Sequence, residues 1–548
     1  MRSLKKTLLL LILSATLLMA NQNTSTYSQE VIVDINRALL SNDQHIVKNQ
    51  TMLQNFYQQR QNRALWLTEN WRIKGSKVMH LLEYIKRDLT LNPHGYIRKK
   101  GQILTKNLEQ RHTQEGLISL EVQLTSLYYE FLHHTVYGEI DWNGFEAELE
   151  NLKRTTAVDY NWVKYPLKFD IISLMSQEDI TQTLHNITPK GYGYQKLINS
   201  LRELYVVKWK GGWNRLPHFK SIKKGYAGPI VKQLRERLKF SKDYRWCKNS
   251  SNGTKFDTCL EKAVKRFQRR HGLTEDGVVG KGTQQVLNIP VEQKINKVLL
   301  NMDRIKWLPR IRAERYINVN IPEYMLHYFE YGQEVQKLRV IVGDKKHPTP
   351  VFSNEISYIT LNPYWKIPEG IVKREVVPAM LKDPNYIKKQ GLEVHTTWEE
   401  NSSIVPLNSI NWNDYADGKE KFPYRLMQPP GQRNALGKIK FKFPNNFSVY
   451  LHDTPSKHLF RKKSRAFSHG CVRLSKPLSL LKTISYDPSI DLIEMNTVLA
   501  GKEKQDVILT YRIPINLIYL TAWVNENNEL TFGDDVYNYD KYQHRIIK

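Results

Sequence analysis

Apolar residues recur at intervals of three and four positions through the first part of the chain. The clearest runs cover residues 78–89 and 117–131. This spacing is typical of amphipathic helices. It predicts a helical scaffold over residues 21–222, with no visible catalytic constellation and with packing roles for its scattered tryptophans. These are Trp66, Trp71, Trp142, Trp162, Trp209 and Trp213.

Shorter helical pieces fill residues 223–290. Two apolar stripes, at 230–238 and 256–267, are separated by a polar loop, and a third short helix closes the unit. Thr258 and Glu261 fit a capping box at the start of the second stripe. The pattern therefore predicts a small bundle of three helices.

The period changes to that of strands in the last part of the chain. Alternating or continuous apolar runs are separated by turn residues, which predicts a mostly-β domain over residues 291–548. A polar insert at about 365–430 is expected to form a subdomain over this β core, and residues 517–524 fit either a strand or a helix. The whole chain is therefore predicted to be a multidomain α+β protein. The strand candidates are 316–320, 325–329, 338–342, 352–361, 447–451 and 507–511.

Charge and the first residues narrow the choice of partners. The chain has 82 Lys and Arg residues against 54 Asp and Glu residues, a formal net charge of +28. Such a surface favours nucleic acid, anionic lipid or an acidic wall polymer. A basic start, an apolar run over residues 8–18 and the small Ala20 predict a secretory signal peptide at residues 1–20, with an uncleaved membrane anchor as the alternative. Export argues against a nucleic-acid partner.

The chain has three cysteines, Cys247, Cys259 and Cys471. In an oxidising compartment an odd count suggests one pair and one free thiol. Cys247 and Cys259 lie twelve positions apart around a polar loop, and a disulfide there would stabilise the fold by roughly 2–3 kcal/mol. That pairing leaves Cys471 as the thiol with candidate chemistry.

The residues around Cys471 suit nucleophilic catalysis. A cysteine nucleophile needs a base or a positive charge nearby, and His452, His469 and Arg473 are the candidates. Gly470 lets the backbone approach a substrate closely, and its N–H with that of Cys471 could stabilise an oxyanion. The two segments read Tyr450-Leu451-His452-Asp453-Thr454 and Ser468-His469-Gly470-Cys471-Val472-Arg473.

Two other roles of Cys471 compete with that of a nucleophile. A lone cysteine is most often a buried structural residue. A zinc site built from His452, His469 and Cys471 matches no standard ligand spacing and lacks an obvious fourth ligand, so neither a metal nor a cofactor is expected. His347, His395 and His458 are interpreted as surface or loop residues and not as catalytic ones.

These segments resemble the L,D-transpeptidase catalytic domain of the YkuD-like family. Its motif is a histidine, a spacer, and then Ser or Thr, His, Gly and Cys, followed by an apolar residue and Arg or Asn. The nineteen positions from His452 to Cys471 suit that motif. The resemblance implies that Cys471 is the nucleophile and His452 the proton donor and acceptor. It assigns His469 and Gly470 to shaping the site and stabilising the oxyanion.

The resemblance also assigns substrate contacts. Arg473 would bind a substrate carboxylate or order the loop, and Tyr450 and Trp365 would face the substrate. Asp453 departs from the Gly or Ser of many smaller members, which leaves open the group that orients His452. Further segments resemble the large Gram-negative YcbB-type subgroup, which combines a helical scaffold, a peptidoglycan-binding domain and a capping insert. They include Trp307-Leu308-Pro309, Asn362-Pro363-Tyr364-Trp365, Gln428-Pro429-Pro430-Gly431 and Thr521-Ala522-Trp523.

Residues 223–290 resemble the three-helix peptidoglycan-binding domain. The likeness rests on Ala263-Val264, Phe267-Gln268, Gly272-Leu273, Asp276-Gly277-Val278-Val279-Gly280 and Thr283.

The resemblances imply a periplasmic enzyme that acylates Cys471 with tetrapeptide stems, releases D-Ala and forms 3-3 cross-links between diaminopimelate residues. Stem peptides and glycan strands are the implied partners, with a cell-wall synthase or a membrane surface as further candidates. Carbapenem-type inhibitors are expected to acylate Cys471. Three alternatives stay open: an L,D-carboxypeptidase with the same site, a non-catalytic wall-binding protein, and transfer of the acyl group to a protein lysine.

Overall fold

The computed structural model describes residues 30–40, 42–92, 94–110, 112–245, 253–310, 313–417 and 420–546. The chain divides into two units. The first comprises the chain up to Glu139 together with Leu167–Arg202, and the second comprises Ile140–Pro166 and the chain from Glu203 onward. The range 21–222, predicted as one scaffold, therefore contributes to both units.

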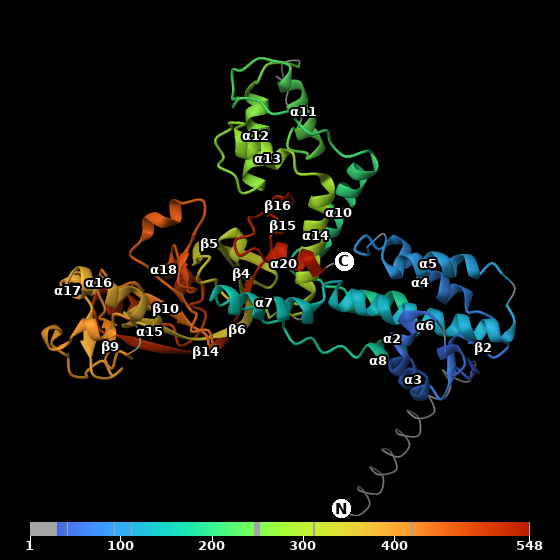
Figure 1. Ribbon diagram of the computed structural model, residues 1–548, viewed down its shortest axis with the longest axis horizontal. Coiled ribbons are helices and arrows are strands. Elements are labelled where there is room, and N and C mark those ends of the chain that lie inside the picture. The colour runs from blue at the N-terminus through green and yellow to red at the C-terminus, as the bar shows by residue number, and fades with distance from the viewer. Residues whose placement is uncertain are drawn as a thin grey trace, which may run out of the picture. The chain divides into compact units, whose positions relative to one another are not determined.

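The first unit is built around the long helix α6 (Gln114–Tyr137), with α4 (Gly75–Arg87) and α5 (Tyr96–Asn107) beside it (Figure 1). The helical pattern missed a two-stranded sheet here, in which β1 (Glu30–Ile32) pairs with β2 (Arg63–Thr68). The buried carboxylate of Glu121 accepts the backbone N–H groups of two β2 residues, which holds this short strand against α6. The other helices are η1 (Ala38–Leu40), α2 (Gln44–Lys48), α3 (Gln50–Gln59), α8 (Ile171–Met175) and α9 (Ile180–Ile187). Helix α10 (Tyr194–Trp209) begins in the first unit and ends in the second.

Helix α7 (Trp142–Thr156) belongs to the second unit although its sequence pattern matches that of the scaffold helices. Its Phe145 is fully buried, with ring centroids 5.6 Å from Trp162 and 6.5 Å from Trp307. These aromatic side chains join the core of the β domain. For each tryptophan of the predicted scaffold the sequence predicts packing in a core or at an interface; Trp209 is 71% exposed, so a core position is wrong for it.

The predicted three-helix bundle consists of α11 (Ile230–Phe240), α12 (Thr258–Arg270) and α13 (Lys281–Leu287) around one small core. The cap of α12 differs from the prediction: Asp257, and not Thr258, is the N-cap residue and accepts the backbone N–H of Leu260 at 2.8 Å. The same carboxylate lies 2.8 Å from Arg235, which ties the start of α12 to α11.

A nine-stranded sheet forms the β domain within the described residues, in the order β12-β5-β13-β11-β10-β6-β14-β3-β4. Because β4 also pairs with β5, the ladder closes on itself. The predicted multidomain α+β class is confirmed. The strands are β3 (Arg315–Asn320), β4 (Met325–Glu330), β5 (Gln333–Gly343), β6 (Phe352–Leu361), β10 (Ile439–Lys442), β11 (Leu451–His452), β12 (Ala466–Ser468), β13 (Val472–Leu474) and β14 (Gln505–Ile518).

Two predicted strands differ in detail. The run 447–451 is mostly loop, because the Asn445 side chain accepts the N–H groups of Phe447 and Val449 and donates to carbonyl groups nearby. The run 517–524 divides between β14 and β15 (Ala522–Val524), which pairs with β16 (Leu530–Phe532). The helices of this domain are α14 (Val291–Lys306), η2 (Ile321–Glu323), η6 (Lys457–Arg461), α18 (Pro477–Thr483), α19 (Leu492–Ala500) and α20 (Tyr539–Ile546).

The insert forms a subdomain with a core of its own, which we call the cap (residues 365–428). A three-stranded sheet in the order β7-β9-β8 is packed with short helices, and Ile367, Met380 and Leu426 are among its buried residues. Its elements are β7 (Trp365–Lys366), α15 (Glu369–Ile371), the π-helical turn η3 (Val372–Val376), α16 (Val377–Lys382), α17 (Tyr386–Gln390), β8 (Glu393–His395), η4 (Leu407–Ser409), η5 (Trp412–Tyr415) and β9 (Arg425–Gln428).

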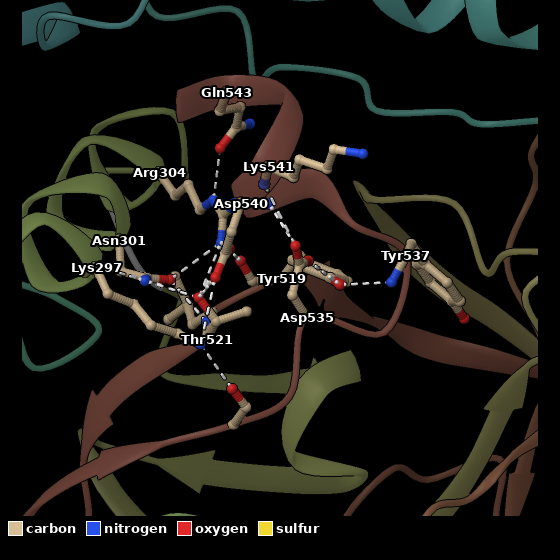
Figure 2. Close-up of polar contacts among 12 residues, drawn as sticks. Lys297, Asn301, Arg304, Tyr519, Thr521, Asp535, Tyr537, Asp540, Lys541 and Gln543 are labelled. Carbon is tan, nitrogen blue, oxygen red and sulfur yellow. Dashed lines mark hydrogen bonds and ion pairs between the residues drawn. The ribbon is translucent and has the colours of Figure 1, made fainter. Parts of the chain in front are cut away.

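A buried polar network joins α14 to α20 and to the end of β14. Figure 2 shows Arg304 directed at Asp540, and the two groups lie 2.8 Å apart. The hydroxyl of Thr521 donates to the same carboxylate at 2.9 Å, and its backbone N–H donates to Asn301 at 2.7 Å. Because the Arg304 side chain is only 1% exposed, this pairing is what allows a guanidinium group in the core.

Candidate active site

Strands β11 and β13 bring four of the predicted site residues together. They pair in parallel, with Leu451 opposite Val472 and His452 opposite Arg473. Side chains alternate along a strand, so His452 and Arg473 share one face of the sheet. The N–H of Val472 donates to the carbonyl of Tyr450 at 3.1 Å, which sets Cys471 beside Tyr450.

The loop that carries Cys471 (residues 468–471) is held by hydrogen bonds of its own residues. The Ser468 hydroxyl donates to the carbonyl of Cys471 at 2.5 Å. Gly470 has a φ of +104°, a conformation that favours glycine. Its carbonyl accepts the Thr349 hydroxyl at 2.7 Å, and that hydroxyl in turn accepts the N–H of Gly343 at 2.8 Å. The backbone at Gly470 is therefore held from strand β5.

Tyr537 extends this support into the core. Its hydroxyl donates to the carbonyl of Gly343 at 2.7 Å and accepts the N–H of Thr349 at 3.1 Å. Its own N–H donates to the hydroxyl of Tyr519, which donates to Asp535 at 2.8 Å (Figure 2). A continuous path of hydrogen bonds thus links the loop of the nucleophile to the network around α20. Sequence reasoning did not single out Tyr537 or Asp535.

The thiol of Cys471 is free and partly exposed. It donates to the carbonyl of Ser448 at 3.7 Å, where a φ of +56° turns that carbonyl toward the thiol. Burial raises the pKa of the Cys471 thiol above its usual value. Hydrogen bonds from Tyr450 and the positive charges of Lys440 and Arg473 act in the opposite direction.

His452 is 4% exposed, and its environment keeps the imidazole neutral. Burial and, after it, the positive charge of Arg473 lower the pKa of His452 to about 3. The backbone groups of Asp453 and Leu436 act in the opposite direction. Neither forms a hydrogen bond with the buried Nδ1 of His452, which has no partner among the described residues. A neutral imidazole can accept a proton from a thiol.

The Asp453 carboxylate serves the fold next to the site. It accepts the N–H of Lys438 at 3.0 Å and pairs with Lys457. Gly437, at a φ of +61°, lies so close that a side chain there would collide with this carboxylate. Asp453 therefore fixes the start of β10 against β11.

His469 connects the loop of the nucleophile to the cap. Its Nε2 lies 2.6 Å from Oε1 of Glu375 in η3, and its ring centroid lies 4.4 Å from that of His347. Nδ1 of His347 lies 3.0 Å from Asp344. His347 lies in a loop, as the sequence predicted, and its ring lies next to that of His469. Glu375, inside a polar insert, gave no signal.

The remaining predicted residues lie in several environments. Trp365 begins β7, pairs with Gln428 and packs partly against the core of the cap. His395 is 2% exposed within β8, so the surface or loop position predicted for it is wrong, whereas His458 is exposed in η6. Cys259 is disulfide-bonded. Cys247, its predicted partner, lies outside the described residues.

The described residues offer neither a cluster of metal ligands nor a membrane-spanning helix. Within the described ranges, no group of three or more His, Cys, Asp and Glu side chains could hold a metal ion. Of the helices in the described part of the chain, none has the length and apolar character needed to cross a membrane.

Three parts of the chain match models of known families. Residues 314–496, which contain the loop and both strands of the site, match the YkuD family model, described as the L,D-transpeptidase catalytic domain. Over these residues the β domain is similar to the YkuD L,D-transpeptidase family. This match is accompanied by matches to a "Scaffold domain" over residues 51–201 and to a "Putative peptidoglycan binding domain" over residues 227–287.

A curated relative of this L,D-transpeptidase domain comes from Haemophilus influenzae and is named "Putative L,D-transpeptidase". It is 35% identical over 256 residues, which cover 46% of this chain and 50% of the relative. The chain thus matches about half the length of that relative. A solved L,D-transpeptidase from Xylanimonas cellulosilytica is 15% identical with a TM-score of 0.17, covering 55% of this chain and 98% of the other. An L,D-transpeptidase from Mycobacterium smegmatis is 12% identical with a TM-score of 0.17, covering 37% and 58%.

Proposed function

We propose that the protein is an L,D-transpeptidase of peptidoglycan that uses Cys471 as its nucleophile. The observation that carries this proposal is the pairing of β13, which follows Cys471 and contains Arg473, with β11, which follows Tyr450 and contains His452, within the domain that matches the family model. A free thiol, a neutral base and a glycine-containing loop with available N–H groups are the parts that acyl transfer through a thioester requires.

The reaction begins at the carbonyl that joins the third stem residue, diaminopimelate, to the terminal D-Ala. The Cys471 sulfur forms a bond to this carbon while its proton passes to His452. The backbone N–H groups of Gly470 and Cys471 stabilise the negative oxygen. The bond to D-Ala then breaks, His452 returns the proton to the leaving amine, and an acyl-thioester remains on Cys471.

A second stem completes the transfer. The side-chain amine of its diaminopimelate attacks the thioester, loses a proton to His452 and forms a 3-3 cross-link as the thiol is restored. Arg473 supports recognition of a substrate carboxylate: among the described residues its buried Nε has no hydrogen-bond partner. The cap contact at Glu375 supports a covered thioester, which disfavours water as the acceptor.

The peptidoglycan-binding match at 227–287 supports attachment to the wall polymer, and the net charge of +28 suits an acidic surface. We place the protein in the periplasm on the basis of the signal-like residues 1–20; retention of that segment would anchor it at the inner membrane. The same proposal includes a cell-wall synthase or a membrane surface as a partner. It also includes carbapenem-type inhibitors, which would acylate Cys471.

Intact-protein mass spectrometry tests the nucleophile. Incubation with a tetrapeptide-stem muropeptide, or with a carbapenem, should give an adduct that maps to Cys471 and is absent in Cys471→Ala. D-Ala release should fall to background in the same variant. Ser448→Ala is the matched control, because Ser448 contacts the thiol through its backbone carbonyl and should retain adduct formation. Release of D-Ala by folded Cys471→Ala would contradict the assignment.

Product analysis separates this proposal from its alternatives. Cross-linked dimers indicate a transpeptidase, and free tripeptides indicate an L,D-carboxypeptidase with the same site. A stem attached to a protein lysine indicates the third acceptor. A wall-binding protein would bind sacculi equally well with and without Cys471 and would release no D-Ala.

A further inference from the structure

Lys440 lies in a row of polar residues that crosses the catalytic sheet. On β10 it pairs with Thr360 of β6 on one side and with His452 of β11 on the other. Thr360 pairs in turn with Asp506, and His452 with Arg473. Residues paired directly across neighbouring strands project from the same face. Lys440 therefore shares the face of the sheet that carries the base.

The Lys440 side chain lies over Tyr450. Its Nζ is 3.8 Å from the centroid of that ring, well within the range of a cation–π contact. The ring of Tyr450 lies edge-on to His452 with centroids 5.6 Å apart. Tyr450 also donates hydrogen bonds that favour the thiolate form of Cys471. Tyr450 thus has contacts with both the ammonium group and Cys471.

We propose that Lys440 is a positioning residue of this active site, whose ammonium group, held over the ring of Tyr450, supplies a positive charge that stabilises the Cys471 thiolate. The proposal rests on the proposed function in that it takes Cys471 as the nucleophile. An ammonium group on the face of a phenol withdraws electron density from the ring, which makes the hydroxyl a stronger hydrogen-bond donor to sulfur. Arg473 contributes a second charge from the opposite strand.

The charge on Lys440 responds to its surroundings. Burial and, after it, repulsion from Lys442 lower the pKa of Lys440 to about 8, while the Cys471 thiolate and Asp506 favour the charged form. Lys440 is therefore charged at neutral pH and loses its proton as the pH rises past about 8. The other groups around Lys440 and Cys471 are Tyr450, His452 from β11, Arg473 from β13 and Lys366 from the cap.

The rate of Cys471 alkylation by iodoacetamide at pH 7, where Lys440 carries its charge, reads the thiolate fraction directly. In the full chain, Lys440→Met should lower this rate about tenfold, and Lys440→Arg should keep it near that of the wild type. Lys442→Met is the matched control: it removes a lysine from the same strand whose Nζ lies 4.8 Å from the ring of Tyr358. That variant should leave the rate unchanged or raise it.

An unchanged rate at pH 7 in Lys440→Met, or an equal fall in Lys442→Met, would overturn the proposal. Lys440→Gln replaces Lys440→Met if the latter fails to fold, as judged by thermal unfolding. D-Ala release by the same samples keeps the two proposals distinguishable. Release by Cys471→Ala sinks the proposed function, whereas an alkylation rate insensitive to Lys440 with release still dependent on Cys471 sinks only the role of Lys440.

Discussion

Oε1 of Glu375 lies 2.6 Å from Nε2 of His469, and this contact joins the cap to the loop of the nucleophile. Both side chains are partly exposed, at 47% and 36%, so the pair contributes less than about 1 kcal/mol to holding the cap in place. Glu375 belongs to the π-helical turn η3, an irregularity often found at functional sites. A contact of this strength favours a cap that covers the site. It also breaks at little cost in free energy, so that substrate can enter.

Glu375→Gln should loosen the cap without unfolding it. We expect faster hydrogen exchange in residues 366–428 and a rise of up to about fivefold in the ratio of tripeptide to cross-linked dimer, because water reaches the thioester more often. Glu369→Gln is the control, since Glu369 pairs with Lys421 inside the cap. Equal exchange and product ratios in both variants would show that the contact has no role in covering the site.

Gly470→Ala should impair catalysis through backbone conformation alone. A methyl group at this position would meet no heavy atom closer than 3.8 Å, so steric overlap does not disfavour alanine. The φ of +104° is the difficulty, and we expect a cost of about 1–3 kcal/mol with loss of most D-Ala release. Gly431→Ala, at a site with open space and no positive φ, should leave activity unchanged. Full activity of Gly470→Ala would exclude an essential loop geometry.

Thr349→Val should reduce turnover more than substrate binding. The hydroxyl of buried Thr349 links the N–H of Gly343 to the carbonyl of Gly470, and valine of the same shape leaves both groups unpaired. We expect a loss of roughly 2–4 kcal/mol in unfolding free energy and a fall in kcat for D-Ala release. Thr531→Val, a buried position in β16, provides the comparison. A change confined to KM would contradict a role in fixing the loop.

His327 should make stability fall with rising pH. Contacts with Glu323 at 3.0 Å and Glu334 at 3.1 Å outweigh burial and raise the pKa of His327 to about 9, from about 6.5 in an unfolded chain. This stabilisation is complete below pH 6.5 and is lost as the pH rises through 9, an effect on the order of 3 kcal/mol.

Thermal unfolding at pH 6.5 and pH 9.5 checks this expectation. The wild type should lose more stability over that interval than His327→Gln, while His458→Gln, at an exposed position, should behave like the wild type. Equal slopes in the wild type and His327→Gln would contradict it. His452, whose pKa is lowered to about 3, affects stability only below pH 6.5 and does not enter this window.

Periodicity predicted the order of helices, bundle and strands because each of these elements buries one face. The short strands β1 and β2 escaped it, since β2 is buried along four consecutive residues and has no alternation to detect. Helix α7 also escaped it, because an amphipathic pattern does not state which core the apolar face joins.

The site was predictable where its residues lie close in sequence. The motif at 468–473 and His452 were found because one loop and two paired strands carry them. Thr349, Tyr537, Lys440 and Glu375 reach the same place from distant segments through hydrogen bonds and strand register, which the sequence does not display. No hydrogen bond to the buried Nδ1 orients His452, because that atom has no partner among the described residues.

The hydrogen bonds from Tyr537 to the Gly343–Thr349 turn have a consequence for how the enzyme matures. Strand β14 separates β6 from β3 in the sheet, and both β14 and Tyr537 follow Cys471 in the chain. A growing polypeptide therefore displays its thiol before the segments that support the Cys471 loop exist. Pairings such as β14 with β3, almost two hundred residues apart, also form slowly. We expect the proposed activity to arise late, as a product of completed folding, so that an immature chain carries the cysteine without the groups that would activate it.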